Sequence, residues 1–402
     1  ELFGVAAIVL RHVGDLPRGD GHVDRFYSAD VLPPVDSSDS DHRWIAVAEL
    51  DTWSDMPPVH LQQIRTCVSD LRHPELPSPR RLPWTQPGWY SAACRWISEQ
   101  AEGIVAGTVE QITCWEQSCV LRVSTQDGLL FFKALPEMYA VEIPAVEMLA
   151  SRFASNIPAT VAVSIEKRWL LMRDFGGRPL MDCRDSASWH SAIHVYASMQ
   201  RSMELHVDQM EAVGIPARPL GDLSQHLTNL LADEAALLSG QEGGLSPEER
   251  DELRVALPGI ETHVQRIERL GIADTLEHGD LHAHNINVGD DGLVFYDWTL
   301  TAVTHPFLSM AYLEQFLEGK NSALPVSLES LREAYVKHWS TIAEVPDLRQ
   351  GLRSAMVLLP LYWALTYHQF IMPFLEPRDR WLREKGVPFH LRQFLRHKLR
   401  AD

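Results

Sequence analysis

The feature that most constrains this chain is a run of eight residues rich in polar side chains, His278-Gly279-Asp280-Leu281-His282-Ala283-His284-Asn285. Two short strand-like runs follow, Ile286 to Val288 and Val294 to Tyr296, with Asp290-Asp291-Gly292 between them, and this pattern is typical of a β-hairpin. Asp297 comes directly after the second run. A loop, a hairpin and an acidic residue in this order can place three oxygen-bearing side chains at one site.

Phosphoryl transfer from a nucleoside triphosphate explains this combination. Such a site needs a carboxylate that orients the attacking hydroxyl and accepts its proton, and oxygen ligands that hold Mg²⁺ on the triphosphate. Asp280 and Asn285 are five residues apart, which is the offset between Asp and Asn in the catalytic loop of protein kinases. Mg²⁺ takes few protein ligands in an octahedral oxygen shell, and one Asn amide oxygen with the carboxylate of Asp297 would satisfy it.

A lysine far upstream supports the same chemistry. Lys133 ends the strand-like run Phe131 to Ala134, about 150 residues before Asp280. A lone lysine in a strand is usually solvent-exposed, but this position in the order of elements fits the strand lysine that contacts nucleotide phosphates. Its expected partner is a glutamate on the next helix, where Glu142 and Glu147 are the candidates.

The pattern of apolar residues changes twice along the chain. Residues 1–85 contain strand-like runs at 5–10 and 44–50 and a helix over 59–73, and we expect an accessory α/β subdomain. Residues 86–176 favour strands, with an Asp127-Gly128 turn signal, and we expect a β-rich lobe. Residues 177–402 are mostly helical, and Ser246-Pro247-Glu248-Glu249 is a strong helix start signal.

The motif also matches a family pattern. HGDLHxxN at 278–285, followed by the Asp297-Trp298 segment, resembles the aminoglycoside phosphotransferase and choline kinase-like enzymes over roughly residues 105–375. The resemblance implies an α+β, bilobal protein-kinase-like fold that uses ATP or GTP with Mg²⁺. It implies that Asp280 is the catalytic base, that Asn285 and Asp297 bind the metal, and that Glu142 rather than Glu147 pairs with Lys133.

Nucleotide recognition in such a fold uses backbone of the segment between the lobes, here Leu171 to Asp174, so we expect Met172 and Asp174 to contribute. The turn that covers the phosphates should lie between the first two strands. Cys114-Trp115-Glu116-Gln117-Ser118-Cys119 occupies that place and contains no glycine. A glycine-rich loop is therefore absent, which leaves the mode of nucleotide binding open.

Two other functions fit parts of the pattern. His278, Asp280, His282 and His284 alternate like ligands of Zn or Fe in a metal hydrolase, although this leaves Asn285 unexplained. A kinase-like protein that binds nucleotide without turnover is the other alternative, although it has no need of a catalytic base. We expect a kinase that phosphorylates a hydroxyl of an aminoglycoside, a sugar or an amino alcohol.

Composition indicates which classes of partner are disfavoured and which cellular compartment to expect. A formal net charge of -18 argues against nucleic acid as a partner. Five cysteines without a CxxC pair indicate neither a disulfide framework nor a zinc ribbon, and they suggest a reducing, cytoplasmic location. The apolar stretch 355–367 is too short to span a membrane, so we expect a buried helix and no membrane partner. The accessory subdomain could shape the acceptor pocket, form a homodimer or brace the β-rich lobe.

Overall fold

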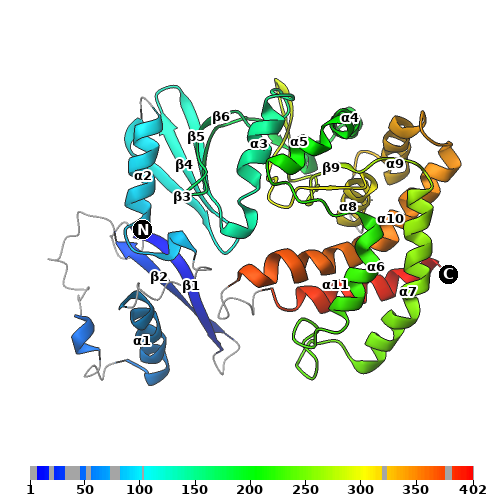
Figure 1. Ribbon diagram of the computed structural model, residues 1–402. Coiled ribbons are helices and arrows are strands. Elements are labelled where there is room, and N and C mark those ends of the chain that lie inside the picture. Colours follow the sequence, from blue (N-terminus) through cyan, green and yellow to red (C-terminus); the bar gives the residue numbers. More distant parts are fainter. Residues whose placement is uncertain are drawn as a thin grey trace. The chain divides into compact units, whose positions relative to one another are not determined.

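The computed structural model describes residues 7–17, 22–31, 46–50, 56–72, 82–101, 104–318, 324–375 and 383–401 (Figure 1). The chain forms two compact units. The first unit consists of Glu1–Glu137 and Val161–Met172, and the second of Met138–Thr160 and Arg173–Asp402. The expected boundaries near residues 85 and 176 remain a prediction.

The first unit begins with a two-stranded antiparallel sheet, in which β1 (Ala7–Pro17) pairs with β2 (Val23–Val31), and with helix α1 (Pro58–Arg72). The expected strand near residues 5–10 and the expected helix over 59–73 are therefore confirmed over their described parts, 7–10 and 59–72. Of the strand expected at 44–50, residues 44 and 45 lie outside the described residues, and over 46–50 the expectation is wrong, because Val47–Glu49 forms a single 3₁₀ turn. The sequence missed β2, whose mixed polar composition reads as a loop and which is paired as a strand only by β1.

A five-stranded sheet forms the rest of the first unit, with the strand order β3-β4-β5-β7-β6. Its strands, in chain order, are β3 (Ile104–Cys114), β4 (Cys119–Thr125), β5 (Gly128–Ala134), β6 (Thr160–Ser164) and β7 (Trp169–Arg173). The turn at Asp127-Gly128 joins β4 to β5, with Thr125 opposite Gly128, as the sequence predicted.

The core of the first unit is aromatic. Helix α2 (Trp89–Gln100) packs its apolar face on the sheet, and two of its tryptophans, with a third from β7, contact Phe132 on β5. The rings that surround Phe132, with centroids 5.4 to 6.1 Å away, belong to Trp89, Trp96 and Trp169. Edge-to-face aromatic packing of this kind stabilises a core beyond simple area burial. These tryptophans are therefore core residues of the sheet.

The second unit is mostly helical (Figure 1). Its helices are α3 (Glu142–Ala150), α4 (Ser186–Met203), α5 (Val207–Ala212), α6 (Leu223–Leu230), α7 (Pro247–Glu268), α8 (Phe307–Leu317), α9 (Leu328–Val336), α10 (Val345–Thr366) and α11 (Gly386–Ala401). The start of α7 carries the predicted capping box, in which Ser246 and Glu249 each accept a hydrogen bond from the backbone N–H of the other.

Two small sheets interrupt the helices of this unit. Strand β10 (Ile286–Gly289) pairs with β11 (Gly292–Phe295) as the predicted hairpin, and with the short β8 (Arg178–Pro179) on its other side. Strand β9 (Thr275–Glu277) pairs antiparallel with β12 (Ala302–Thr304). The residues between β9 and β10, His278 to Asn285, are called the polar loop below.

Helix α10 lies at the centre of the helical core and packs against α7, α8 and α11. By length and composition alone, the described segment Val345–Phe374 could cross a membrane, but 56% of its most apolar window is buried inside the protein. The core helix of a folded protein passes the same test, and the expectation of a buried helix at 355–367 is confirmed by the burial of Leu358, Leu361 and Leu365. A π-helical turn, Tyr367–Ile371, continues the helix.

Candidate active site

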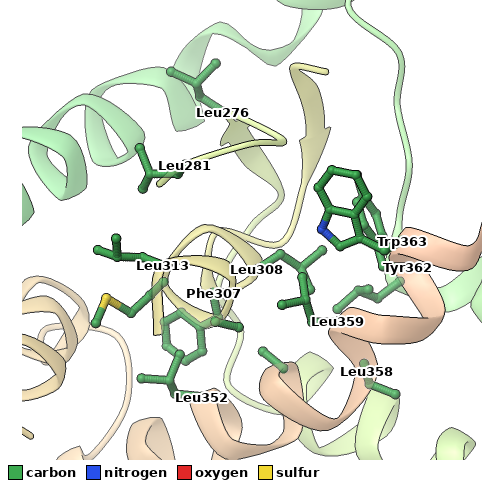
Figure 2. Close-up of a cluster of buried hydrophobic side chains, with 14 of the residues drawn as sticks. Leu276, Leu281, Phe307, Leu308, Leu313, Leu352, Leu358, Leu359, Tyr362 and Trp363 are labelled. Atoms are coloured by element: carbon green, nitrogen blue, oxygen red, sulfur yellow. The ribbon is translucent and has the colours of Figure 1, made fainter. Parts of the chain in front are cut away.

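Apolar side chains on both sides of the polar loop anchor it to the helical core. Leu276 on β9 and Leu281 within the loop are buried in the same hydrophobic cluster as residues of α8 and α10 (Figure 2). Ala283 is also fully buried, whereas Asp280 and His282 between these anchors are only half-buried. Alternation of anchored apolar residues with accessible polar ones therefore fixes the loop and leaves its chemistry near solvent.

Gly279 makes the tight bend of the loop possible. Its φ is +81°, in the left-handed region that favours glycine. A Cβ atom at this position would lie 2.1 Å from the carbonyl oxygen of Leu300. No side chain fits in that space, so the backbone of the loop can approach residue 300 only with glycine at 279.

His278 ties the polar loop to the residues after β11. Its Nδ1 lies 3.3 Å from the backbone N–H of Asp280, and its Nε2 lies 3.0 Å from the carbonyl oxygen of Tyr296. Because an N–H can only donate and a carbonyl can only accept, the ring proton is on Nε2. The ring also packs on Trp298, with centroids 4.4 Å apart. His278 therefore fixes the conformation of the polar loop.

These hydrogen bonds weaken the metal-hydrolase alternative. Both ring nitrogens of His278 are committed to backbone groups, so neither is available as a ligand. Within the part of the chain that the structure describes, no group of three or more His, Cys, Asp or Glu side chains is arranged to hold a metal ion. The alternating residues of the polar loop therefore do not form a zinc or iron site.

Asp280 is held in one orientation by its neighbours. The hydroxyl of Tyr312, on α8, donates to Oδ1 of Asp280 at 2.5 Å. Burial, and then the charge of Asp280, raises the pKa of Tyr312, so this hydroxyl keeps its proton and stays a donor. The other carboxylate oxygen, Oδ2, lies 3.4 Å from Nδ2 of Asn285 and 3.6 Å from Nε2 of His282. One oxygen is thus anchored, and the other faces the remaining polar groups of the loop.

Tyr312 is a site residue that the sequence did not reveal. It lies on a helix whose other residues are mostly buried, and nothing in its local sequence distinguishes it from a core aromatic. The position of α8 beside the polar loop, which no local pattern records, gives the hydroxyl its partner.

Asn285 closes the polar loop and points its amide oxygen away from it. Its Nδ2 donates to the carbonyl oxygen of Asp280 at 3.0 Å. Since a carbonyl can only accept, the nitrogen must face it, and Oδ1 is left for another partner. No described residue hydrogen-bonds to that Oδ1. An amide oxygen of this kind is a suitable ligand for Mg²⁺.

Asp297 lies at the same end of the β10–β11 hairpin as Asn285. Ile286 is paired with Phe295, and the backbone N–H of Tyr296 donates to the carbonyl of Asn285 at 3.1 Å. Tyr296 therefore lies beside Asn285, and Asp297 is the next residue after Tyr296. Asp297 has a φ of +66°, which is costly for a residue with a side chain. Such strain concentrates at functional sites, and the carboxylate of Asp297 offers oxygens of the type that Mg²⁺ prefers.

The other predicted residues lie in both units. Lys133 on β5 is 8% exposed and pairs with Val120 on β4, and Met172 on β7 is half-buried. In the second unit, Glu142 is the first residue of α3 and is buried, whereas Glu147 on the same helix is exposed. Asp174 is exposed, and its Oδ1 accepts a hydrogen bond from the backbone N–H of Gly176 at 3.0 Å.

The buried carboxyl group of Glu277 hydrogen-bonds to the backbone of the polar loop. Oε1 of Glu277 accepts a hydrogen bond from the backbone N–H of Gly279 at 3.2 Å, and Oε2 accepts one from the hydroxyl of Ser309 on α8. Glu277 is 2% exposed, and burial raises its pKa from the usual value to about 7, against the smaller lowering effect of these hydrogen bonds. The charged form of Glu277 is therefore unfavourable in the folded chain.

Because Glu277 is buried, we expect the substitution Glu277→Gln to change folding stability by an amount that depends on pH. Between the usual carboxyl pKa and about 7, the unfolded chain ionises at this residue while the folded chain stays protonated, so folding stability falls as pH rises through that window. Glutamine cannot ionise and keeps hydrogen-bonding groups for Gly279 and Ser309. We expect the variant to be more stable than the wild type by about 3 kcal/mol at pH 8, with the difference vanishing near pH 4.

Urea unfolding of the two proteins at several pH values measures this difference. The exposed Glu147→Gln is the matched control, because it makes the same chemical change outside the core. A difference between Glu277→Gln and wild type that does not change with pH would show that the buried carboxyl does not titrate as described.

Comparison with known proteins rests on structure. No protein-family model matches the chain, and no curated protein matches it in sequence. The GDP complex of aminoglycoside 2'-phosphotransferase-IIIa is similar with a TM-score of 0.54 at 15% identity, over 78% of this chain and 99% of that one.

Two other solved structures are similar to the same degree. For choline kinase from Cryptosporidium parvum the TM-score is 0.53 at 12% identity, over 77% of this chain and 96% of the other. For ethanolamine kinase from Plasmodium vivax the TM-score is 0.53 at 12% identity, over 87% and 96%. The resemblance that the motif at 278–297 indicated is thereby confirmed in the fold: the chain has the bilobal, α+β, protein-kinase-like fold of the aminoglycoside phosphotransferases and choline kinases.

Proposed function

We propose that this protein is a small-molecule kinase that transfers the γ-phosphoryl group of ATP or GTP to a hydroxyl of its acceptor. The observation that carries the proposal is the anchored carboxylate of Asp280, which Tyr312 holds through one oxygen and which has the amide of Asn285 beside the other. A kinase-like fold with this loop has the groups that phosphoryl transfer requires. A protein that only binds nucleotide has no use for a carboxylate held in this way.

Asp280 acts as the catalytic base. Its Oδ2 accepts a hydrogen bond from the acceptor hydroxyl and then the proton, while the hydrogen bond from Tyr312 keeps Oδ1 from rotating into that position. Orientation is the main contribution, because little covalent chemistry falls to the protein in phosphoryl transfer. His282, whose Nε2 is 3.6 Å from Oδ2, lies where it can steady the same oxygen.

Asn285 and Asp297 would hold Mg²⁺, the first through its amide oxygen and the second through its carboxylate. Bound there, the metal would supply positive charge for the triphosphate and the transferred phosphoryl group. Two observations support this metal site. Nδ2 of Asn285 donates to Asp280, so Oδ1 of the amide is left for a metal ion. The backbone of Asp297 is strained, as is common at functional sites. Thr299, whose hydroxyl donates to Oδ1 of Asp297 at 3.1 Å, orients that carboxylate.

The nucleotide is bound by Lys133, Glu142, Met172 and Asp174. Lys133 contacts the phosphates, and Glu142 orients the lysine; the burial of Glu142 and the exposure of Glu147 favour the former. Backbone groups at Met172 and Asp174 recognise the base. One structural neighbour is a complex with GDP, so GTP is a candidate phosphoryl donor as well as ATP.

The acceptor is a small molecule with a free hydroxyl, such as an aminoglycoside, a sugar or an amino alcohol. The structural neighbours are named as an aminoglycoside phosphotransferase, a choline kinase and an ethanolamine kinase, and the net charge of -18 suits a cationic acceptor. The same charge disfavours nucleic acid as a partner, and we propose that the enzyme works in the cytoplasm.

An acceptor screen tests the proposed function. The purified chain is incubated with Mg²⁺, ATP or GTP, and a panel of aminoglycosides, other antibiotics, amino sugars and choline-like alcohols. We expect nucleoside diphosphate release that depends on one acceptor class, with a product whose mass has increased by one phosphoryl group. Nucleotide binding without transfer to any acceptor class would instead favour a binding protein with this fold.

A further inference from the structure

Two cysteines lie opposite each other where β3 turns into β4. Cys114 is the last residue of β3 and Cys119 the first of β4, and the ladder pairs them directly. Both are free thiols. The segment Cys114–Cys119 is called the cysteine hairpin below.

The phase of the hydrogen-bond ladder brings the two side chains close. The backbone N–H of Trp115 donates to the carbonyl of Ser118 at 3.1 Å, so that pair is hydrogen-bonded. Because hydrogen-bonded and non-hydrogen-bonded pairs alternate along antiparallel strands, the cysteines occupy a non-hydrogen-bonded position, where Cα atoms approach to about 4.5 Å. Disulfides join cysteines whose Cα atoms are roughly 4.4 to 6.8 Å apart, so a bond can form with little backbone movement.

The environments of the two thiols differ. Cys114 is half-buried, and its thiol donates to the carbonyl of Leu10 at 3.5 Å. Cys119 is fully buried, and its hydrogen bond with Cys114, followed by burial itself, raises its pKa. An oxidant therefore reaches Cys114 first, and Cys119 is the neighbouring thiol that can react with an oxidised Cys114.

The cysteine hairpin lies next to residues proposed for the nucleotide site. In the β4–β5 ladder Cys119 is opposite Ala134, and the next residue, Val120, is opposite Lys133. In kinases of this fold the turn between the first two strands covers the phosphates of the nucleotide. The indole N–H of Trp84 donates to the carbonyl of Trp115 at 3.1 Å and so ties this turn to residue 84.

We propose that Cys114 and Cys119 are a redox modification site, and that a reversible disulfide between them fixes the cysteine hairpin and weakens nucleotide binding. The effect on nucleotide rests on the proposed function, whereas formation of the bond does not. The oxidant is hydrogen peroxide: it converts the Cys114 thiol to a sulfenic acid with release of one water, and the Cys119 thiol then attacks that sulfur and releases a second water as the S–S bond forms. The peroxide takes up the two electrons that the thiols lose, and a dithiol reductant reverses the reaction.

Peptide mass spectrometry tests the bond. The full chain is reduced, treated with hydrogen peroxide, alkylated and digested with trypsin, which releases the peptide 96–122 with Cys114 and Cys119 as its only cysteines. We expect this peptide to carry no alkyl group and to be lighter than its reduced form by two hydrogens. Two alkyl groups on the peptide after oxidation, or a sulfinic acid at residue 114, would overturn the proposal.

Three variants control this measurement. Cys114→Ser retains a hydroxyl that can donate to Leu10, and the peptide should then carry one alkyl group, on Cys119. Cys119→Ala keeps an apolar side chain in the core and leaves an oxidised Cys114 without a second thiol, so the peptide should gain oxygen instead of losing two hydrogens. Cys67→Ser, on α1, removes a thiol elsewhere in the first unit and should leave the peptide oxidised as in the wild type.

Nucleotide kinetics test the consequence. We expect the KM for nucleotide to rise by about threefold or more on oxidation, to return to its original value with dithiothreitol, and to be insensitive to peroxide in Cys114→Ser. A disulfide that forms without any change in KM would overturn the effect on nucleotide. If no acceptor is phosphorylated at all, the peptide still reports the bond and direct nucleotide titration replaces KM, so failure of the proposed function is distinguished from failure of this one.

Discussion

Replacement of Asp280 by asparagine is expected to lower kcat by about a thousandfold, within the range that general-base catalysis contributes. Asparagine has the same shape and can still accept the hydrogen bond from Tyr312 through its amide oxygen, so the polar loop should keep its conformation. It cannot accept a proton. The affinity for nucleotide should change little, because Asp280 is not among the proposed ligands of the metal or the phosphates.

Steady-state kinetics with the acceptor found in the screen, together with nucleotide titration, measures this effect. Tyr312→Phe is the matched variant, since it leaves the carboxylate of Asp280 in place and removes only the group that orients it. We expect a smaller loss of kcat, about tenfold, from poorer positioning. If Asp280→Asn turns over at the rate of the wild type, Asp280 is not the base and the proposed function loses its principal residue.

Replacement of Gly279 by alanine is expected to destabilise the second unit by about 3 kcal/mol or more and to abolish activity. The left-handed backbone alone costs a residue with a side chain about 1 to 3 kcal/mol. In addition, the new Cβ would lie 2.1 Å from the carbonyl oxygen of Leu300, which belongs to the backbone and cannot rotate away. The polar loop would have to move, and its hydrogen bonds around Asp280 would be lost with it.

Gly271→Ala separates the two costs. Gly271 has a similar φ of +70°, but a Cβ there would meet nothing within 4 Å. We expect this control to lose about 1 to 2 kcal/mol from backbone strain alone and to keep its activity. Thermal unfolding and activity of both variants provide the comparison. Equal destabilisation of the two would show that the contact with Leu300 does not constrain the loop.

Elements with local signals were predictable from the sequence. The capping box at Ser246, the turn at Asp127-Gly128 and the β10–β11 hairpin each depend on a few neighbouring residues, and the structure contains all of them. Strand β2 was missed because its residues alternate poorly, and only the backbone of β1 gives it a partner. A run of apolar residues at 44–50 misled the prediction, because apolar character alone does not make a strand.

The candidate site likewise has residues that the sequence predicted and residues that only the structure revealed. The spacing of Asp280, Asn285 and Asp297 could be read directly from the chain, because a short loop and one hairpin separate them and their proximity is a local property. The sequence by itself thus determined the type of fold and the residues proposed for its chemistry.

Only the tertiary structure decided which groups hold those residues in place. Tyr312 reaches Asp280 from a helix 32 residues away in the chain, and Ser309 reaches Glu277 from the same helix. The alignment of Cys114 with Cys119 likewise depends on the phase of a ladder rather than on their spacing. Packing of helices and register of strands are set by the sum of many weak contacts across the chain, so no local pattern of residues records them.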